Sequence, residues 1–355
     1  MKILFLADAS SIHTQQWIRY FLQKKYEVEV ISFLPARIDG AKVHWINVGE
    51  VSPYKTNFKY ILKLPKVIKI KLKSKPDILI AHYATSYGLI TSLISFKFIL
   101  AVHGTDIKVT PKKNILFYFF TRFVLKRADL IFSVAQHMSD DIIRMGIPSD
   151  KIFTIQYGID ETKFFRDKKD KYQYHCISTR SLRKNSNVDK IIKAISILKS
   201  QNKNIKLLVV GDGPEREYLK ELVNKLEIEE NVTFTGKISQ EELSQFLRQS
   251  EIYISMTNSD GSSLSLLEAM ISGNIPLVSD NAANREWIKD SESGFIISKD
   301  EETIASKIND ILNMNRAEKE TILKKANAIV MEKGIYQKNM PLIEKRIIKT
   351  FKSQS

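Results

Sequence analysis

Short apolar runs alternate with longer segments of helical periodicity along almost the whole chain, and this alternation limits the folds that are available. Buried strands that are separated by helices indicate parallel sheets with helices on both faces. The runs predicted as strands are residues 3–7, 28–33, 43–48, 78–82, 98–103, 130–134, 152–156, 176–178, 206–210, 232–235, 252–255, 276–278 and 295–297. We therefore expect an α/β protein with two doubly wound, Rossmann-like parallel-sheet domains that face a central cleft.

A charged stretch, RDKKDK at residues 166–171, interrupts this pattern. A length of 355 residues also suits two domains. We predict a first domain over residues 1–165, a linker over 166–171 and a second domain over 172–334. A C-terminal helix within 335–355 is expected to cross back to the first domain.

The positive charge of the chain is concentrated in its first half. The formal net charge is +15, and residues 1–165 hold 24 Lys and Arg against 13 Asp and Glu. Two blocks without acids, Lys55–Lys75 and Lys112–Arg127, mix basic residues with aromatic and aliphatic ones. This mixture is typical of contact with an anionic membrane surface. Two alternatives stay open: solvated helix faces over a core, and nucleic-acid binding, for which no zinc finger, RNP signature or basic zipper is present.

The cysteine content and the apolar runs bear on the compartment. Cys176 is the single cysteine, which excludes an internal disulfide framework and a cysteine-based zinc cluster. No apolar run reaches the roughly 18 residues of a membrane span, and the run after Lys2 is too short for a signal peptide. We expect a cytoplasmic protein, attached peripherally to the inner face of the membrane, with no specific nucleic-acid partner.

The second half contains a polar turn, TNSDGSSLSLLEA at residues 257–269, between a predicted strand and a predicted helix. Backbone N–H groups at a helix start bind anions, and the hydroxyls of Ser262 and Ser263 add donors. Glu268 lies eight positions after Asp260, so it is expected about one turn inside the helix. A carboxylate at that place can accept hydrogen bonds from a vicinal diol. A simple N-cap explains the serines equally well when this turn is considered alone.

A second polar segment, STRSLRK at residues 178–184, also follows a strand. Its cations Arg180, Arg183 and Lys184 are close enough in sequence for two of them to meet on one diphosphate, where they would neutralise a leaving group without a metal. A solvated basic loop is the alternative. The tight turn at 211–214, GDGP, lacks the full glycine fingerprint of dinucleotide binding.

Histidines follow three strands of the first half. His13 and His103 are expected on the same edge of the sheet, and His82 with Tyr83 ends a further strand. Histidine can contact a sugar hydroxyl or a phosphate, or transfer a proton near neutral pH. A structural hydrogen bond to the backbone is the alternative for each one alone, but three histidines at strand ends favour a site.

These motifs together resemble the retaining GT-B glycosyltransferases of glycosyltransferase family four, also called glycosyl transferases group one. The resemblance covers about residues 1–300 and lies in these segments: SIHTQQW (11–17), AHYATSYG (81–88), HGTD (103–106), YGID (157–160), VVGDGP (209–214), VTFTG (232–236), DGSSLSLLEAM (260–270) and IPLVSD (275–280).

The resemblance implies a role for each matching residue. Glu268 would bind the ribose diol, and Asp260, one methylene shorter than the family glutamate, would face the transferred sugar. Arg180 would hold the diphosphate with Lys184, or with Arg183 in its place. Four residues would be catalytic: His103, Asp260, Arg180 and Lys184. The donor site would contain Arg180, Lys184 and Asp260 and, in addition, Arg183, Gly211, Gly236, Ile238, Gly261, Ser262, Ser263, Leu264 and Glu268. The acceptor or sugar side would contain His13, His82, Tyr83, His103 and Asp106.

The resemblance further implies transfer of a sugar, with retention, from a nucleoside diphosphate to a glycan acceptor that we expect to be lipid-linked. A UDP-sugar is favoured over a GDP-sugar, and no metal or other cofactor is expected. The alternatives are a nucleotide-sugar epimerase on the same fold and a basic membrane- or nucleic-acid-binding protein with a vestigial nucleotide site.

Overall fold

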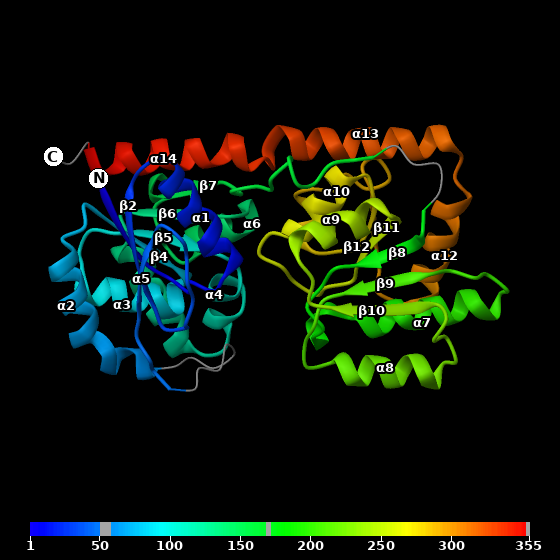
Figure 1. The fold of residues 1–355 in the computed structure, drawn as a ribbon, viewed down its shortest axis with the longest axis horizontal. Helices are drawn as coiled ribbons and strands as arrows, with labels where there is room; N and C mark the ends of the chain where they lie inside the picture. Colours follow the sequence, from blue (N-terminus) through cyan, green and yellow to red (C-terminus); the bar gives the residue numbers. More distant parts are fainter. Residues whose placement is uncertain (50–57, 168–171, 353–355) are drawn as a thin grey trace. The chain divides into compact units, whose positions relative to one another are not determined.

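A computed structural model of the chain describes residues 1–49, 58–167 and 172–352 (Figure 1). The chain divides into two compact units. The first unit is Met1–Gln156 together with Met340–Ser355, and the second unit is Tyr157–Asn339.

The first unit is built on a seven-stranded parallel sheet with the order β3-β2-β1-β4-β5-β6-β7. The central strands are apolar on both faces, and residues 3–6 have no exposed surface. The strands are β1 (Lys2–Leu6), β2 (Glu27–Ser32), β3 (Lys42–Trp45), β4 (Ile78–His82), β5 (Ile99–Val102), β6 (Leu130–Ser133) and β7 (Ile152–Thr154).

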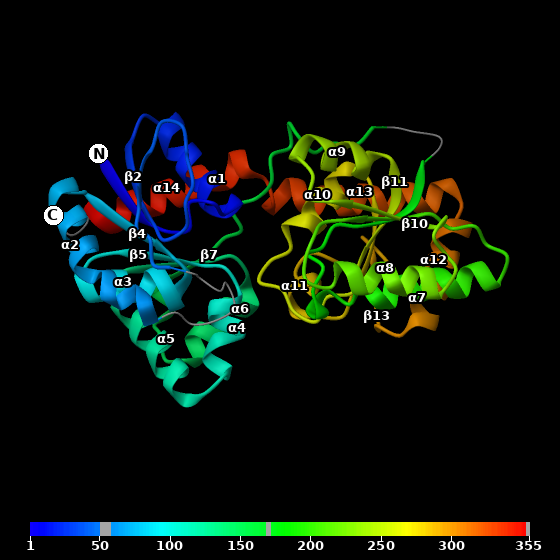
Figure 2. The same ribbon diagram turned by 60° about the horizontal axis from the view of Figure 1, so that its bottom comes forward.

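Helices cover both faces of this sheet. In Figures 1 and 2, α1 and α14 lie on one face and α2, α3 and α5 on the other, as right-handed crossovers require. The helical segments are α1 (Ile12–Gln23), the 3-10 helix η1 (Phe58–Lys63), α2 (Leu64–Ser74), the π-helix η2 (Tyr83–Tyr87), α3 (Gly88–Ile94), α4 (Thr105–Lys108), η3 (Thr110–Lys112), α5 (Ile115–Arg127), α6 (Gln136–Arg144), η4 (Ser149–Lys151) and α14 (Tyr336–Lys352).

The second unit has a six-stranded parallel sheet with the order β10-β9-β8-β11-β12-β13. Figure 1 shows α9, α10 and α13 on one face and α7 and α8 on the other. Its elements are β8 (Tyr174–Ser178), η5 (Lys184–Ser186), α7 (Val188–Ser200), β9 (Leu207–Val210), α8 (Arg216–Lys225), β10 (Val232–Gly236), α9 (Gln240–Arg248), β11 (Ser250–Ser255), α10 (Leu264–Ser272), β12 (Ile275–Ser279), α11 (Ala282–Arg285), β13 (Phe295–Ile297), α12 (Glu301–Asn313) and α13 (Arg316–Lys333).

The predicted fold class is confirmed, since every run predicted as a strand forms one, with ends that differ by at most a few residues. The boundary between the units comes earlier than the predicted linker, of which residues 168–171 lie outside the described structure. Residues 157–165 belong to the second unit because Ile159 pairs with Ile335 and Phe164 is buried in its core.

The helical face predicted over Lys55, Lys59, Lys63 and Lys66 is not one α-helix. Residues 50–57, with Lys55, lie outside the described structure, and Phe58–Lys63 is a 3-10 helix before α2 begins at Leu64. Pro65 explains the change, since proline has no N–H to continue the hydrogen bonding of the preceding turn and fits the first turn of a new helix.

Helix α14 begins in the second unit and ends in the first. In the first unit, the hydroxyls of Tyr20 and Tyr26 each donate to the carboxylate of Glu344 at 2.6 Å. Burial and this carboxylate raise the pKa of Tyr26 to about 12, so the phenol stays protonated. Residues Ile343 and Ile347 of the same helix have no exposed surface.

Candidate functional site

Arg180 is the centre of a polar network at the carboxyl ends of the second unit's strands. It follows β8, and its Nη1 donates to Ser263 Oγ at 3.1 Å and to Ser265 Oγ at 3.2 Å. Ser263 is the N-cap of α10, and Ser265 also hydrogen-bonds to the hydroxyl of Tyr253 at 3.0 Å. The network therefore places a guanidinium directly at a helix N-terminus, where an anion is favoured.

Asp260 pairs with this arginine. Its Oδ2 lies 2.8 Å from Arg180 Nη2, and its Oδ1 accepts the N–H of Gly261 at 2.8 Å. Burial would lower the pKa of Arg180, but the charge of Asp260 raises it above its ordinary value. The sequence analysis gave these residues separate partners, a diphosphate and a sugar. In the structure they form one ion pair, because the turn 257–263 folds back over the end of β8.

Glu268 lies one turn inside α10, and its side chain is half-buried. Burial raises the pKa of its carboxyl to about 7. Among the described residues it has no hydrogen-bond or ion-pair partner. A diol that donated two hydrogen bonds would stabilise the ionised form, so this carboxylate is chemically suited to bind one.

The segment 183–187 lies beside the same turn. Asn185 Nδ2 donates to Thr257 Oγ1 at 3.2 Å and to the carbonyl of Ser259 at 3.1 Å, which ties η5 to the turn. Arg183 and Lys184 are both exposed, and no described residue pairs with the Lys184 ammonium. The predicted second cation can therefore be either of them.

Two glycines let the loop at 211–213 pack against the loop that carries Arg180. A Cβ at Gly211 would come within 2.6 Å of the Arg180 carbonyl oxygen, and one at Gly213 within 2.3 Å of the Leu182 carbonyl oxygen. The Gly211 N–H donates to the Gly236 carbonyl at 2.9 Å, so both predicted glycines meet at this edge. Ile238, two residues later, is partly buried.

The first unit gathers the predicted histidines at the carboxyl edge of its own sheet. His103 stacks on His13 with ring centroids 5.4 Å apart and contacts Tyr83 at 4.6 Å. His82 Nδ1 lies 3.3 Å from both His103 Nε2 and Thr14 Oγ1. Burial, reinforced by the neighbouring histidines, lowers the pKa of His82 to about 3 and that of His103 well below its ordinary value. His82 and His103 are therefore neutral at pH 7.

His82 differs from the prediction that it lines a sugar or acceptor site. It has no exposed surface, because Trp17 and Phe5 pack edge-on against its ring. His82 contacts the ring of His103 from the protein interior. His13, Tyr83 and His103 are partly exposed.

Asp106 holds the backbone around this cluster. Its carboxylate accepts three N–H groups, from Ala84 at 2.9 Å, Gly104 at 3.0 Å and His103 at 3.2 Å. It is 1% exposed, so it positions the loop and does not offer a free oxygen to solvent. The turn that it fixes carries Tyr83 at a φ of 67°, a left-handed conformation that is strained for a tyrosine.

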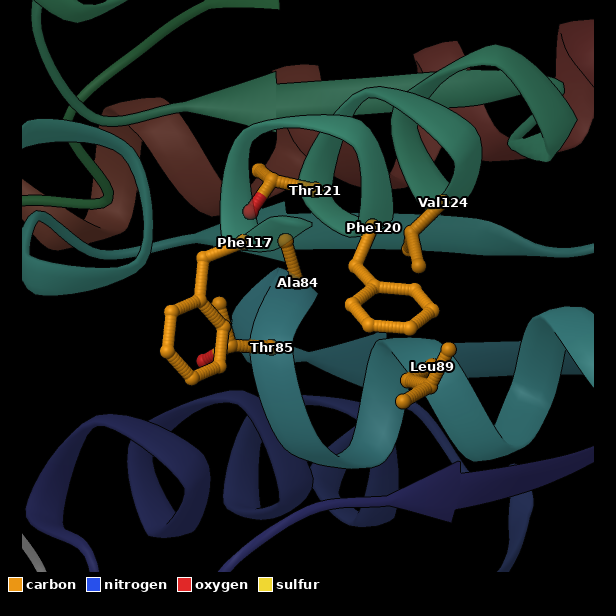
Figure 3. Close-up of a pocket in the computed structure, with 7 residues that line it drawn as sticks. All are labelled: Ala84, Thr85, Leu89, Phe117, Phe120, Thr121 and Val124. Carbon is orange, nitrogen blue, oxygen red and sulfur yellow. The ribbon is translucent and has the colours of Figure 1, made fainter. Parts of the chain in front are cut away.

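Behind this turn lies a small apolar pocket (Figure 3). Side chains of α5 point toward η2 and α3, and the pocket is lined by Ala84, Thr85, Leu89, Phe117, Phe120, Thr121 and Val124. The aromatic residues of α5 thus divide by helical period. Phe117 and Phe120 face inward, whereas Phe119 and Phe123 are exposed.

Helices α2, α3 and α5 and the segments that adjoin them also carry many exposed apolar and basic residues, a set that we call the basic-apolar face. Contacts of α3 with both α2 and α5 make the three helices one layer. The exposed apolar residues of this face are Leu62, Ile68, Leu72, Leu93, Phe96, Ile115, Leu116, Phe119 and Phe123, and its exposed lysines include Lys66, Lys69, Lys73, Lys97, Lys112, Lys113 and Lys126. Two basic residues of the predicted block have structural partners instead, since Arg122 Nε donates to the Met145 carbonyl at 2.7 Å and Arg127 stacks on Phe96.

Ser265 and Tyr253 are site residues that the sequence analysis missed. Ser265 stands in the serine-rich helix start, and Tyr253 is a polar-tipped aromatic residue inside a buried strand, which usually needs a hydrogen-bond partner. These signals were present, but the fold was needed to show that both lead to Arg180.

Two features are absent from the described residues, a membrane-spanning helix and a metal-binding cluster. Within residues 1–49, 58–167 and 172–352, no helix is both long and apolar enough to cross a membrane. The same residues contain no group of three or more His, Cys, Asp and Glu side chains arranged to hold a metal ion.

Comparison with known proteins gives two family matches along the chain. The family described as "Glycosyl transferase 4-like" matches residues 2–135, and "Glycosyl transferases group 1" matches residues 159–328. The two matches cover all strands of both sheets except β7, which lies between the matched ranges. The second match contains the network around Arg180, and the first contains the histidine cluster.

Relatives and solved structures are similar over most of the chain. N-acetyl-alpha-D-glucosaminyl L-malate synthase of Bacillus anthracis is 26% identical over 77% of this chain and 76% of its own length. An amylovoran biosynthesis glycosyltransferase of Erwinia amylovora is 24% identical over 83% of this chain and 86% of its own. The crystal structure of Anabaena Alr3699/HepE in complex with UDP and glucose superposes with a TM-score of 0.79, at 17% identity, over 99% of this chain and 100% of that one.

Proposed function

This chain belongs to the group 1 glycosyltransferases and has the GT-B fold, and from this premise we propose that it transfers a sugar, with retention, from a nucleoside diphosphate to a lipid-linked glycan. The observation that carries the proposal is the Arg180 network at the start of α10, with Glu268 half-buried one turn further on. A guanidinium, a helix N-terminus and a diol-binding carboxylate are the groups that a nucleoside diphosphate needs. A UDP-sugar is the favoured donor, supported by the UDP and glucose bound to the Anabaena protein.

In the proposed reaction, the bond between the anomeric carbon and the diphosphate oxygen breaks first, and the sugar becomes oxocarbenium-like. Arg180, Lys184 and the N-terminus of α10 stabilise the negative charge of the leaving diphosphate. The acceptor hydroxyl then forms its bond to the anomeric carbon on the same face, and its proton passes to the departing phosphate oxygen. In this reaction neither a protein nucleophile nor a metal takes part.

The remaining site residues take the roles that the family resemblance implies. Asp260 would turn from Arg180 toward the transferred sugar once a diphosphate neutralises the guanidinium. The neutral ring of His103, supported by His82, would contact the sugar through one nitrogen, while His13 and Tyr83 border the acceptor side. Gly211, Gly236 and Ile238 would lie beside the nucleotide, and Gly261, Ser262, Ser263 and Leu264 beside the phosphates.

We also propose that the protein acts in polysaccharide or glycolipid synthesis at the inner face of the membrane, through its basic-apolar face. The support is the concentration of exposed Phe and Leu side chains among lysines on α2, α3 and α5. Each Lys or Arg near an anionic surface adds about 1 kcal/mol of attraction. The Erwinia relative, whose name places it in amylovoran biosynthesis, supports the polysaccharide role.

The test is a panel of UDP- and GDP-sugars incubated with lipid-linked acceptors, with products analysed by mass spectrometry and anomeric configuration by NMR. We expect one donor to be consumed with retention in the presence of an acceptor and to be unaffected by a chelator. Conversion of the donor without any acceptor would instead identify an epimerase. Absence of any donor turnover across the panel would reject the enzymatic proposal.

A further inference from the structure

A groove of about 900 Å³ lies at the amino edge of the first unit's sheet, opposite the edge that carries the histidines. The starts of β1, β2 and β3 form one wall, and one side of α2 forms the other. Its volume falls within the range of small-molecule sites. The proposed transfer reaction does not use it.

The acids of the groove are already neutralised. Lys2 Nζ lies 2.8 Å from the Glu27 carboxylate and 2.7 Å from that of Glu29, and His44 Nε2 lies 2.6 Å from Glu29. Burial would raise the pKa of Glu29, but hydrogen bonds from Lys2 and His44 lower it to about 2. Glu29 therefore stays ionised and satisfied at neutral pH.

The remaining charges of the groove are positive and lack partners. Lys42 from β3 and three residues of α2, Lys66, Lys69 and Lys73, line it without an ion pair to any described residue. Five lysines against two glutamates give the groove a formal net charge of +3. A convergence of unpaired ammonium groups in a concave site favours a phosphate group.

Ser74 supplies an independent sign of a missing ligand. It ends α2, lines the groove and is 7% exposed. Its Oγ has no hydrogen-bond partner among the described residues. Buried hydroxyls are nearly always paired, so a ligand oxygen in the groove would complete this one.

The surroundings of the groove indicate where that phosphate comes from. On the same helix, Ile68 is 41% exposed and Leu72 is 67% exposed. Ile68 and Leu72 directly precede the groove residues Lys69 and Lys73 in the chain, so exposed apolar side chains of the same helix would be available to the hydrocarbon chains of a lipid whose headgroup lay in the groove. We propose that this groove binds the phosphate headgroup of an anionic membrane lipid; the inference rests on the proposed membrane association of the enzyme.

The test uses full-length protein and vesicles of phosphatidylcholine with or without 20% phosphatidylglycerol, and it measures co-sedimentation. A double variant, Lys69→Ala with Lys73→Ala, is compared with a matched pair outside the groove, Lys113→Ala with Lys126→Ala. We expect the groove pair to weaken binding to the anionic vesicles at least five times more than the matched pair. Equal losses would show diffuse attraction by surface charge and would overturn the proposal.

Ser74→Ala provides a second variant that leaves the net charge unchanged. We expect it to fold normally and to bind anionic vesicles about tenfold more weakly, the lower end of the effect of losing one hydrogen bond to a charged group. Unchanged binding of this variant would remove the groove from the binding site.

Soluble competitors separate the sources of the phosphate. We expect glycerol 3-phosphate and a single-stranded oligonucleotide to compete only at concentrations far above that of the vesicle lipid. One result would overturn the lipid proposal: a competitor displaces the vesicles fully at a concentration equal to that of the lipid, and this competition is lost in the groove variants. The groove would then bind a soluble phosphate ester or nucleic acid. Donor turnover is assayed separately, so failure of the transferase proposal would not be mistaken for failure of this one.

Discussion

The two units hold polar residues at the carboxyl edges of similar parallel sheets, but the chemistry of the two edges differs. The first unit packs aromatic rings together, with His103 in contact with His13, Tyr83 and the buried His82, and burial keeps His82 and His103 neutral. The second unit pairs full charges, Arg180 with Asp260, and adds hydroxyls around them. Neutral rings suit an uncharged sugar and an arginine at a helix start suits an anion, so the same fold supplies two kinds of surface.

The largest expected effect tests the charged edge. Arg180→Ala should lower kcat/KM about 10³-fold, because the leaving diphosphate loses a preorganised donor. Initial rates with the donor identified by the panel measure this effect. The control is Arg285→Ala, which removes an exposed arginine that pairs with Asp280 and should leave the rate unchanged. A rate within threefold of wild type for Arg180→Ala would remove this residue from the phosphate site.

The next effect concerns the backbone beneath that edge. Gly213→Ala should cost about 3 kcal/mol of the second unit's stability, because its Cβ would overlap the Leu182 carbonyl oxygen and push the Arg180 loop away. Urea unfolding measures it. Gly49→Ala, in open space, is the control and should cost only the roughly 1–2 kcal/mol of a left-handed alanine. Equal losses would mean that the close approach of the two loops is not rigid.

A smaller effect separates the edges by their response to pH. With a pKa of about 7, Glu268 ionises between pH 6 and pH 8, and only the ionised carboxylate accepts both diol hydrogen bonds. The donor KM should fall about tenfold over this range, the effect of roughly one charge-assisted hydrogen bond. In Glu268→Gln the KM should not change with pH, and a wild-type KM that is also constant would contradict the prediction.

The same group makes a prediction about stability. Its folded pKa lies above its ordinary value of 4.5, so the folded state binds the extra proton. The stabilisation is therefore complete below about pH 4.5 and is lost as the pH rises through 7. Thermal unfolding of the wild type relative to Glu268→Gln at pH 5.5 and pH 8 should show this loss. A wild type that gained stability relative to the variant at pH 8 would argue against a raised pKa of this carboxyl.

The smallest effect is expected at the neutral edge. Burial lowers the pKa of His82 to about 3 and that of His103 well below its ordinary value, so we expect neither ring to change charge between pH 6 and pH 8. In the Glu268→Gln background, kcat/KM should vary less than about twofold across this range. An ascending or descending limb near pH 6.5 would show that a histidine titrates and would break the comparison between the edges.

The sequence alone predicted the strands and the positions of the motifs, because apolar period and turn residues are local signals. It could not predict which polar groups meet. Tyr253 and Ser265 reach Arg180 only through the packing of β11 against β8, and the burial of His82 depends on Trp17 of α1. The boundary between the units was also set by a distant pairing, that of Ile159 with Ile335.

The last helix has a consequence for how the protein is made. Tyr20 and Tyr26 are synthesised early, yet their partner Glu344, like the buried Ile343 and Ile347, is synthesised only after the whole of the second unit. Domains usually fold in the order in which they emerge. Here the first unit must wait with part of its apolar surface uncovered until the second has been synthesised. A chain that terminated after the first sheet but before α14 would therefore expose apolar surface and be prone to aggregation. We expect such a fragment to depend on chaperones or to be degraded.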